Sequence, residues 1–144
     1  MVKTVAIFNA SDDTVAMLSV LLSEAGYRVV SGQVDEVKSG AMDFIAFMDT
    51  HQPDAIIWDI APPYDRNWTF FKLLRSIGPL ANRAIVLTTT STEHLESVAG
   101  KQTGAIELVG KPYDLNVIVA AVARGMEQQT QRGPAGPFGL PKPS

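Results

Sequence analysis

One short apolar run, flanked by turn-forming residues, constrains the fold more than any other stretch of the chain. Residues 55–58 read Ala-Ile-Ile-Trp, follow Pro53-Asp54, and lead into Asp59 and a proline-rich loop. A run of this length between turns is typical of a strand buried on both faces of a parallel sheet. In an open α/β sheet, ligands bind just beyond the carboxyl ends of the strands. Asp59 therefore lies where such a fold places functional acids, although a loop aspartate without a role fits this segment equally well.

Strand-like and helix-like patterns alternate along most of the chain. β-prone runs predict strands at Val2–Phe8, Tyr27–Ser31, 55–59, Arg83–Thr88 and Ala105–Val109. Apolar residues at three- and four-residue spacing predict helices at 12–25, Val34–Met48, Trp68–Ile77, Thr92–Lys101 and from Asp114 onward. Five strands alternating with five helices predict an α/β fold in which helices cover both faces of a parallel sheet.

Composition excludes several classes of protein. The chain has 144 residues, 46% of them hydrophobic and 19% charged, which fits one globular domain with its own core. The net charge of −3 argues against electrostatic binding of nucleic acid. Cysteine is absent, so disulfide and thiol chemistry are excluded. No apolar run approaches the roughly 20 residues that span a bilayer, so we expect a cytoplasmic protein with no membrane contact.

The composition changes abruptly near the carboxyl end of the chain. The last residues read EQQTQRGPAGPFGLPKPS and are rich in Pro, Gly and Gln. Such a segment cannot build a core element and is typical of a flexible tail. We therefore expect a domain over residues 1–127 and a flexible tail over 128–144, too short to fold as an output domain.

Polar side chains follow several of the predicted strands. Asn9 and Ala10 follow the first strand, Asp59 the third, Thr88 and Thr89 the fourth, and Lys111 the fifth. A carboxylate, a hydroxyl and an ammonium group at adjacent strand ends can converge on one phosphoryl group. In such a site the carboxylate is the nucleophile, the hydroxyl donates a hydrogen bond, and the ammonium group neutralises phosphoryl oxygens.

With these residues in place, residues 2–125 resemble the response-regulator receiver domain of two-component signalling. The resemblance rests on Asp59 with Pro63 four positions on, Thr88 at the end of strand four, and the motif Lys111-Pro112-Tyr113. It implies a CheY-like, flavodoxin-like doubly wound sheet of five parallel strands in the order 2-1-3-4-5.

The resemblance also implies roles for the residues at the strand ends. Asp59 would be the phosphoacceptor, Thr88 the switch hydroxyl and Lys111 the lysine that contacts the phosphate. Thr89 would also contact the phosphoryl group and crowd its access, since the family prefers Ala or Gly at this position.

The sequence departs from the family where receivers carry an acidic pair that binds Mg²⁺. The family places its second acid about sixteen residues before the glycine that closes the first helix, and counting back from Gly26 gives Ala10. Asp12 and Asp13 are then residues of the first helical turn, capped by Ser11. Asn9 and Ala10 would form a degenerate metal pocket, in which Asp59 remains the main anionic ligand and binds Mg²⁺ weakly.

Two functions follow from the sequence. The first is a stand-alone receiver-like module of pseudo-receiver type, not an enzyme, in which phosphorylation of Asp59 is weak or absent. It would act through contacts with a histidine kinase, a phosphotransfer protein or a downstream protein, using the fourth helix, the fifth strand and the last helix. The second is a flavodoxin-like small-molecule-binding protein or enzyme on the same architecture. Its first loop would need a phosphate cradle, and the sequence NASDDT there is acidic and lacks glycine.

Overall fold

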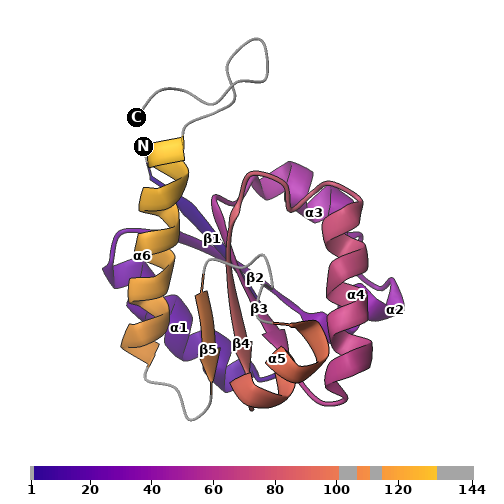
Figure 1. The fold of residues 1–144 in the computed structure, drawn as a ribbon. Coiled ribbons are helices and arrows are strands. Elements are labelled where there is room, and N and C mark those ends of the chain that lie inside the picture. Colours follow the sequence, from indigo (N-terminus) through magenta and orange to yellow (C-terminus); the bar gives the residue numbers. More distant parts are fainter. Residues whose placement is uncertain (1, 101–106, 111–114, 133–144) are drawn as a thin grey trace.

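The computed structural model describes residues 2–100, 107–110 and 115–132, which form a parallel sheet with helices on both faces (Figure 1). The elements in chain order are β1 (Thr4–Asn9), α1 (Asp12–Glu24), β2 (Arg28–Gln33), α2 (Val34–Ser39), α3 (Phe44–His51), β3 (Ala55–Ile60), α4 (Tyr64–Ser76), β4 (Ala84–Thr89), α5 (Thr92–Ala99), β5 (Glu107–Gly110) and α6 (Leu115–Arg132). The strands pair in the order β2-β1-β3-β4-β5, and adjacent strands run parallel. The predicted doubly wound parallel α/β architecture is confirmed.

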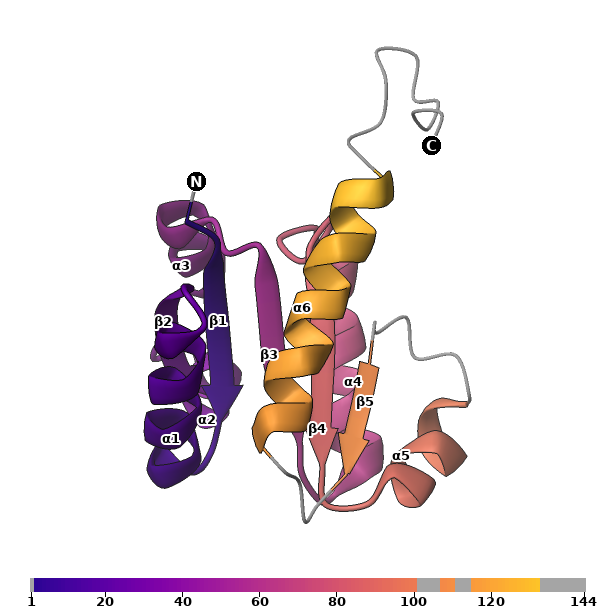
Figure 2. The ribbon, with the colours of Figure 1, turned by 90° about the vertical axis from the view of Figure 1, so that its left-hand side faces the viewer.

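Strand alternation divides the core into two layers. Val5, Ile7 and Ile57 belong to a cluster with residues of α1 and α6, whereas Phe8 and Trp58 belong to a cluster with residues of α2, α3, α4 and α5. Successive side chains of a strand point to opposite faces, so neighbouring residues of the same strand enter different clusters. Figure 2 shows α1 and α6 in front of the sheet and the strands pointing the same way.

The helix predicted over Val34–Met48 is wrong as one element, because the structure breaks it into α2 and α3. Gly40 ends α2 with a φ of 81°, a left-handed conformation that glycine adopts at low cost. Asp43 then caps α3, and its side chain accepts a hydrogen bond from Ala46 N at 3.0 Å. Ile45, an apolar residue within the predicted helix, is 58% exposed.

The helix predicted over Trp68–Ile77 begins earlier and faces the core differently. α4 starts at Tyr64, and its buried residues are Trp68, Phe71 and Leu74. Ile77, the last residue of the predicted helix, is the C-cap of α4 and is 50% exposed.

The buried residues of α1 and α6 lie at the apolar spacing that predicts these two helices. Ser11 caps α1 by accepting a hydrogen bond from Thr14 N at 3.2 Å, and Leu18 and Leu22 are fully buried. α6 buries Ile118 and Val122 and continues to Arg132, past the predicted domain boundary at residue 127. The remainder of the predicted tail lies outside the described residues, so its flexibility stays a prediction.

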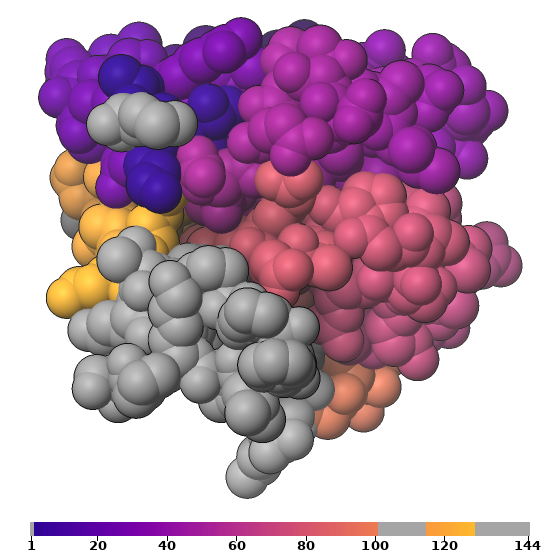
Figure 3. Space-filling model, turned by 90° about the horizontal axis from the view of Figure 1, so that it is seen from above, coloured from indigo at the N-terminus to yellow at the C-terminus, as the bar shows by residue number. Residues whose placement is uncertain are grey.

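Arg83 ties the chain together at the amino edge of the sheet. Its guanidinium group donates hydrogen bonds to the carbonyl oxygens of Pro79 and Pro53 and to Gln52 Oε1. Burial lowers the pKa of Arg83 from its usual value, and the carboxylate of Asp54 opposes this shift. Seen from this end, the first half of the chain and the later residues lie on opposite sides of the molecule (Figure 3). The opposite, carboxyl edge carries the candidate site.

Candidate functional site

Three polar side chains share one face at the carboxyl edge of the sheet. Asn9 follows Ile7 by two residues and Asp59 follows Ile57 by two residues, so both continue the face that packs against α1 and α6. Thr88 follows Val86 on the same face and pairs with Asp59 in the β3–β4 register. All three residues are buried, with Asn9 2%, Asp59 8% and Thr88 1% exposed. The parallel order β1-β3-β4 therefore brings an amide, a carboxyl group and a hydroxyl together.

The Thr88 hydroxyl donates a hydrogen bond to Asp59 Oδ1 at 2.6 Å. This length lies within the range of roughly 2.5–2.7 Å for a hydroxyl that donates to a carboxylate. The structure thus brings together the two residues that the sequence predicts as phosphoacceptor and switch hydroxyl.

Thr89 lies on the other face of β4. It is fully buried, and its hydroxyl accepts a hydrogen bond from Ser91 N at 3.4 Å. The hydroxyl that donates to Asp59 is that of Thr88, and the predicted phosphoryl contact of Thr89 stays a prediction. Lys111, with Pro112 and Tyr113, lies outside the described residues, and its predicted contact with the phosphate stays a prediction.

The acidic residues near the end of β1 belong to the start of α1. Asp12 and Asp13 occupy the first helical turn and are exposed, and Asp12 Oδ1 accepts a hydrogen bond from Gln33 Nε2. The prediction that this pair starts the helix is confirmed. Asn9 is the last residue of β1, and the exposed Ala10 follows it. The structure therefore places Asn9, and not an acid, beside Asp59.

In the side-chain amide of Asn9, the oxygen has a hydrogen-bond partner and the nitrogen has none among the described residues. Its Oδ1 accepts a hydrogen bond from Ser11 N at 2.9 Å. Its Nδ2 is buried and has no hydrogen-bond partner among the described residues. Because a backbone N–H can only donate, this contact identifies which amide atom is the oxygen. Asn9 thus presents a donor, not an acceptor, as its free group.

The family resemblance implies a bound Mg²⁺ ion. The donors and acceptors at this edge of the sheet fit that ion poorly. Mg²⁺ requires hard oxygen ligands in near-octahedral geometry, and an amide N–H group cannot serve as one. Asp59 is the one acid among the buried described residues, so a cation at this edge would have a single charged ligand from them. Across the described ranges, no three His, Cys, Asp or Glu side chains come together as they would around a metal ion.

The loop after β3 is fixed on its α2 side by Asn67. Asn67 Nδ2 donates to the carbonyl oxygen of Ala61 at 2.6 Å, two residues after Asp59. Lys38 Nζ of α2 donates to Asn67 Oδ1 at 2.7 Å. Ala61 O is therefore another oxygen at this edge that already has a donor. The sequence analysis missed this role, although Asn67 follows the strand end that carries Asp59.

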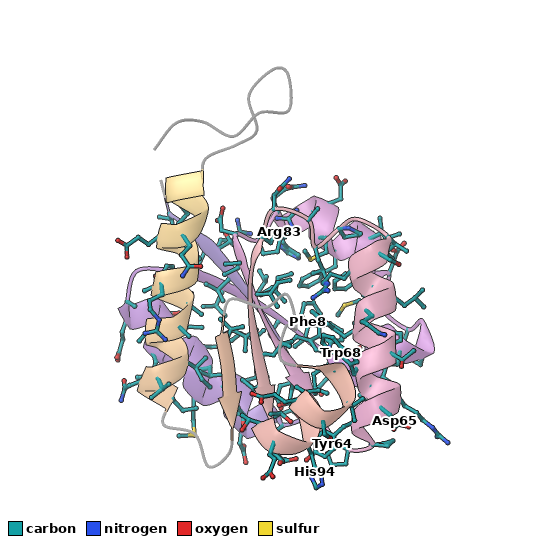
Figure 4. The ribbon with its side chains drawn as sticks, viewed as in Figure 1. Phe8, Tyr64, Asp65, Trp68, Arg83 and His94 are labelled. Atoms are coloured by element: carbon teal, nitrogen blue, oxygen red, sulfur yellow. The ribbon has the colours of Figure 1, made fainter. Side chains whose placement is uncertain are left out.

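Tyr64 fixes the same loop on its α5 side. Its hydroxyl is hydrogen-bonded to Thr90 Oγ1, and its ring stacks on His94 with centroids 5.5 Å apart. Figure 4 shows Tyr64 and His94 at this edge of the sheet, far from Arg83. Tyr64 follows β3 and Thr90 follows β4, so the neighbouring strand ends are the signal that could have predicted this contact.

Comparisons with known proteins indicate one kind of fold. No protein-family model matches the sequence. The chain is 22% identical to the DNA-binding transcriptional regulator NtrC of Bradyrhizobium over 129 residues, which are 88% of the chain and 25% of that protein. It is 28% identical to the transcriptional regulatory protein GltR of Pseudomonas aeruginosa over 106 residues, which are 74% of the chain and 41% of that protein. The chain thus spans well under half the length of these curated relatives.

A solved structure supports the same fold. The chemotaxis protein CheY4 of Vibrio cholerae superposes with a TM-score of 0.66 at 24% identity, over 86% of this chain and 98% of that one. At this identity the likeness shows the fold. Among the described residues, no helix has both the length and the apolar character needed to cross a membrane.

Proposed function

We propose that this chain, which has the CheY-like fold of a response-regulator receiver domain, is a receiver-like signalling module of a two-component or phosphorelay system. Asp59 is its phosphoacceptor. The observation that carries the proposal is the buried pair of Asp59 and Thr88, joined at 2.6 Å where β3 and β4 end side by side. The sequence likeness to two transcriptional regulators supports the same reading.

The chemistry of the proposed site is phosphoryl transfer to a carboxylate. A carboxylate oxygen of Asp59 attacks the phosphorus of a phosphodonor, the bond from phosphorus to the leaving oxygen breaks, and an acyl phosphate forms. The Thr88 hydroxyl, now donating to Asp59, is in reach to donate to a phosphoryl oxygen. Lys111 would supply the positive charge. The chain has no catalytic turnover in this proposal and is a signalling protein rather than an enzyme.

The proposed module is of pseudo-receiver type, with slow phosphorylation and with Mg²⁺ binding too weak to speed it. Asn9 and Ala10 stand in place of the acidic pair, so one carboxylate, Asp59, is left to attract the cation. The output is contact with other proteins of the pathway in the cytoplasm: a histidine kinase, a phosphotransfer protein or a downstream protein. The face formed by α5, β5 and α6 is the proposed partner surface, and the half-exposed Val98 and Val117 lie on its two helices.

Intact-mass analysis after incubation with acetyl phosphate tests the proposal. The wild type should gain the mass of one phosphoryl group slowly, and Asp59→Asn should gain none. Asp65→Asn is the matched control, because Asp65 is an exposed acid in the first turn of α4 at the same edge. Labelling that survives Asp59→Asn, or no labelling of the wild type, refutes the assignment of Asp59. Rapid labelling that requires Mg²⁺ refutes the pseudo-receiver type and leaves an ordinary receiver.

A further inference from the structure

The orphan donor of Asn9 needs a physical explanation. The residue is 2% exposed, and its Nδ2 has no partner among the described residues. A buried donor without an acceptor is costly, and native proteins almost always satisfy such groups with protein, water or ligand. The amide cannot relieve this by rotating, since its Oδ1 is held by Ser11 N at 2.9 Å. Nδ2 therefore stays the unsatisfied donor of this side chain.

The place of this donor limits what the acceptor can be. The last residues that pair between β1 and β3 are Phe8 and Trp58, so Asn9 and Asp59 are the next residues of the two strands. Adjacent strands lie about 4.8 Å apart, and both side chains project from the same face. The donor thus lies beside the carboxyl group that the proposed function makes the phosphoacceptor.

We propose that Asn9 makes this pocket a site for a phosphoryl oxyanion and not for a divalent cation. Nδ2 donates a hydrogen bond to a phosphoryl oxygen on Asp59, the role that a metal ion fills in a site with more carboxylates. The inference rests on the proposed function and adds to it the group that stabilises the product. Acyl phosphate has oxygens that need donors, whereas the oxygens of Asn9 and Ala61 at this edge already accept hydrogen bonds.

The transfer step balances without a metal ion or a proton. An Asp59 oxygen forms a bond to the phosphorus of acetyl phosphate, and the bond from phosphorus to the acetate oxygen breaks. Acetate leaves with the electron pair. Nδ2 of Asn9 and Oγ1 of Thr88 then donate to oxygens of the bound phosphoryl group. Two neutral donors stabilise this charge less than a divalent cation does, so we expect labelling to be slow.

Thermal melts with and without Mg²⁺ test the exclusion of the cation. The wild-type Tm should not respond to Mg²⁺. Asn9→Asp, alone and together with Ala10→Asp, should lower the Tm without metal because like charges then adjoin Asp59, and Mg²⁺ should raise it again. Asn82→Asp is the matched control. It adds the same charge at an exposed position just before β4, and its φ of 64° is one that both Asn and Asp tolerate.

Labelling with acetyl phosphate in EDTA or in Mg²⁺ tests the donated hydrogen bond. The wild type should label at the same rate in both. Asn9→Leu keeps the approximate volume without the donor and should label about tenfold more slowly or worse. Asn9→Asp should label only with Mg²⁺.

The outcomes separate this inference from the proposed function. No labelling of the wild type refutes the proposed function itself. Equal labelling of wild type and Asn9→Leu refutes only the role of Asn9, and means that Nδ2 holds a buried water. A wild-type Tm that rises in Mg²⁺ by as much as that of Asn9→Asp refutes the claim that the site of Asn9 and Asp59 does not bind a divalent cation.

Discussion

Thr88→Val removes the hydrogen bond to Asp59 while keeping the shape of the side chain. The hydroxyl is 1% exposed and donates to Asp59 Oδ1 at 2.6 Å. A hydrogen bond to a charged group contributes about 1.5–3 kcal/mol, and the methyl group of valine recovers part of this by apolar burial. We expect the free energy of unfolding to fall by about 1–2 kcal/mol. With a urea m-value of about 2 kcal/mol/M, the unfolding midpoint should fall by about 0.5–1 M.

Thr89→Val provides a control at the next residue of the same strand. Thr89 is equally buried, but its hydroxyl contacts Ser91 at 3.4 Å, near the limit for a hydrogen bond. The same substitution there should change the free energy of unfolding by about 0.5 kcal/mol or less, since so long a bond contributes little.

A double-mutant cycle with Asp59→Ala isolates the pair. Urea denaturation of wild type, both single variants and the double variant should give a coupling energy of about 1–2 kcal/mol between Thr88 and Asp59, within the usual range for residues in contact. Coupling below about 0.5 kcal/mol, or an equal loss in Thr89→Val, would show that the hydrogen bond does not stabilise the fold.

Three further substitutions test contacts elsewhere. Gly32→Ala should cost about 1–3 kcal/mol in urea denaturation, because the added Cβ would lie 2.5 Å from Met42 Cε and 2.9 Å from a ring carbon of the fully buried Phe8. A loss below about 0.5 kcal/mol would mean that both neighbours move freely. Arg83→Ala should lower the free energy of unfolding by about 1.5–3 kcal/mol, since three oxygens lose a charged donor; an unchanged midpoint would contradict this. Tyr64→Phe should speed amide exchange in the loop after β4 and cost about 1 kcal/mol or less, and unchanged exchange there would show that the hydroxyl does not fix that loop.

The sheet and the central pair of the site were predictable because the sequence signals for them are local. Short apolar runs marked the strands, and the residue after each run marked the carboxyl edge. Asp59 and Thr88 were named on that basis and lie in contact. Their neighbours were harder. Thr88 and Thr89 are adjacent in the sequence, but the two-residue period of a strand sends their side chains to opposite faces.

The sequence at the break between α2 and α3 carries two conflicting patterns, the spacing of its apolar residues and its helix-capping residues. Apolar spacing continued through Ala41 and Phe44 and favoured one helix, while Gly40 and Asp43 carried the stop and start signals. The backbone followed the caps, with Gly40 left-handed and Asp43 as N-cap. The contacts of Tyr64 and Asn67 depend on side-chain conformations across different loops, and no period in the sequence encodes those.

The described residues around Asp59 at the carboxyl edge carry little charge, which explains how their side chains can form hydrogen bonds with one another and with the backbone. Among the described residues that are buried, Asp59 is the one acid, and the other polar ones are neutral. Clustered carboxylates repel one another, so a pocket with two more acids would depend on a bound cation to remain stable. Asn9 and Thr88 are neutral, so they add no such repulsion, and their amide and hydroxyl groups can hold this edge in order without metal. Nδ2 of Asn9 is left without a hydrogen-bond partner among the described residues. Under the proposed function, this donor is available to an oxygen of a phosphoryl group on Asp59.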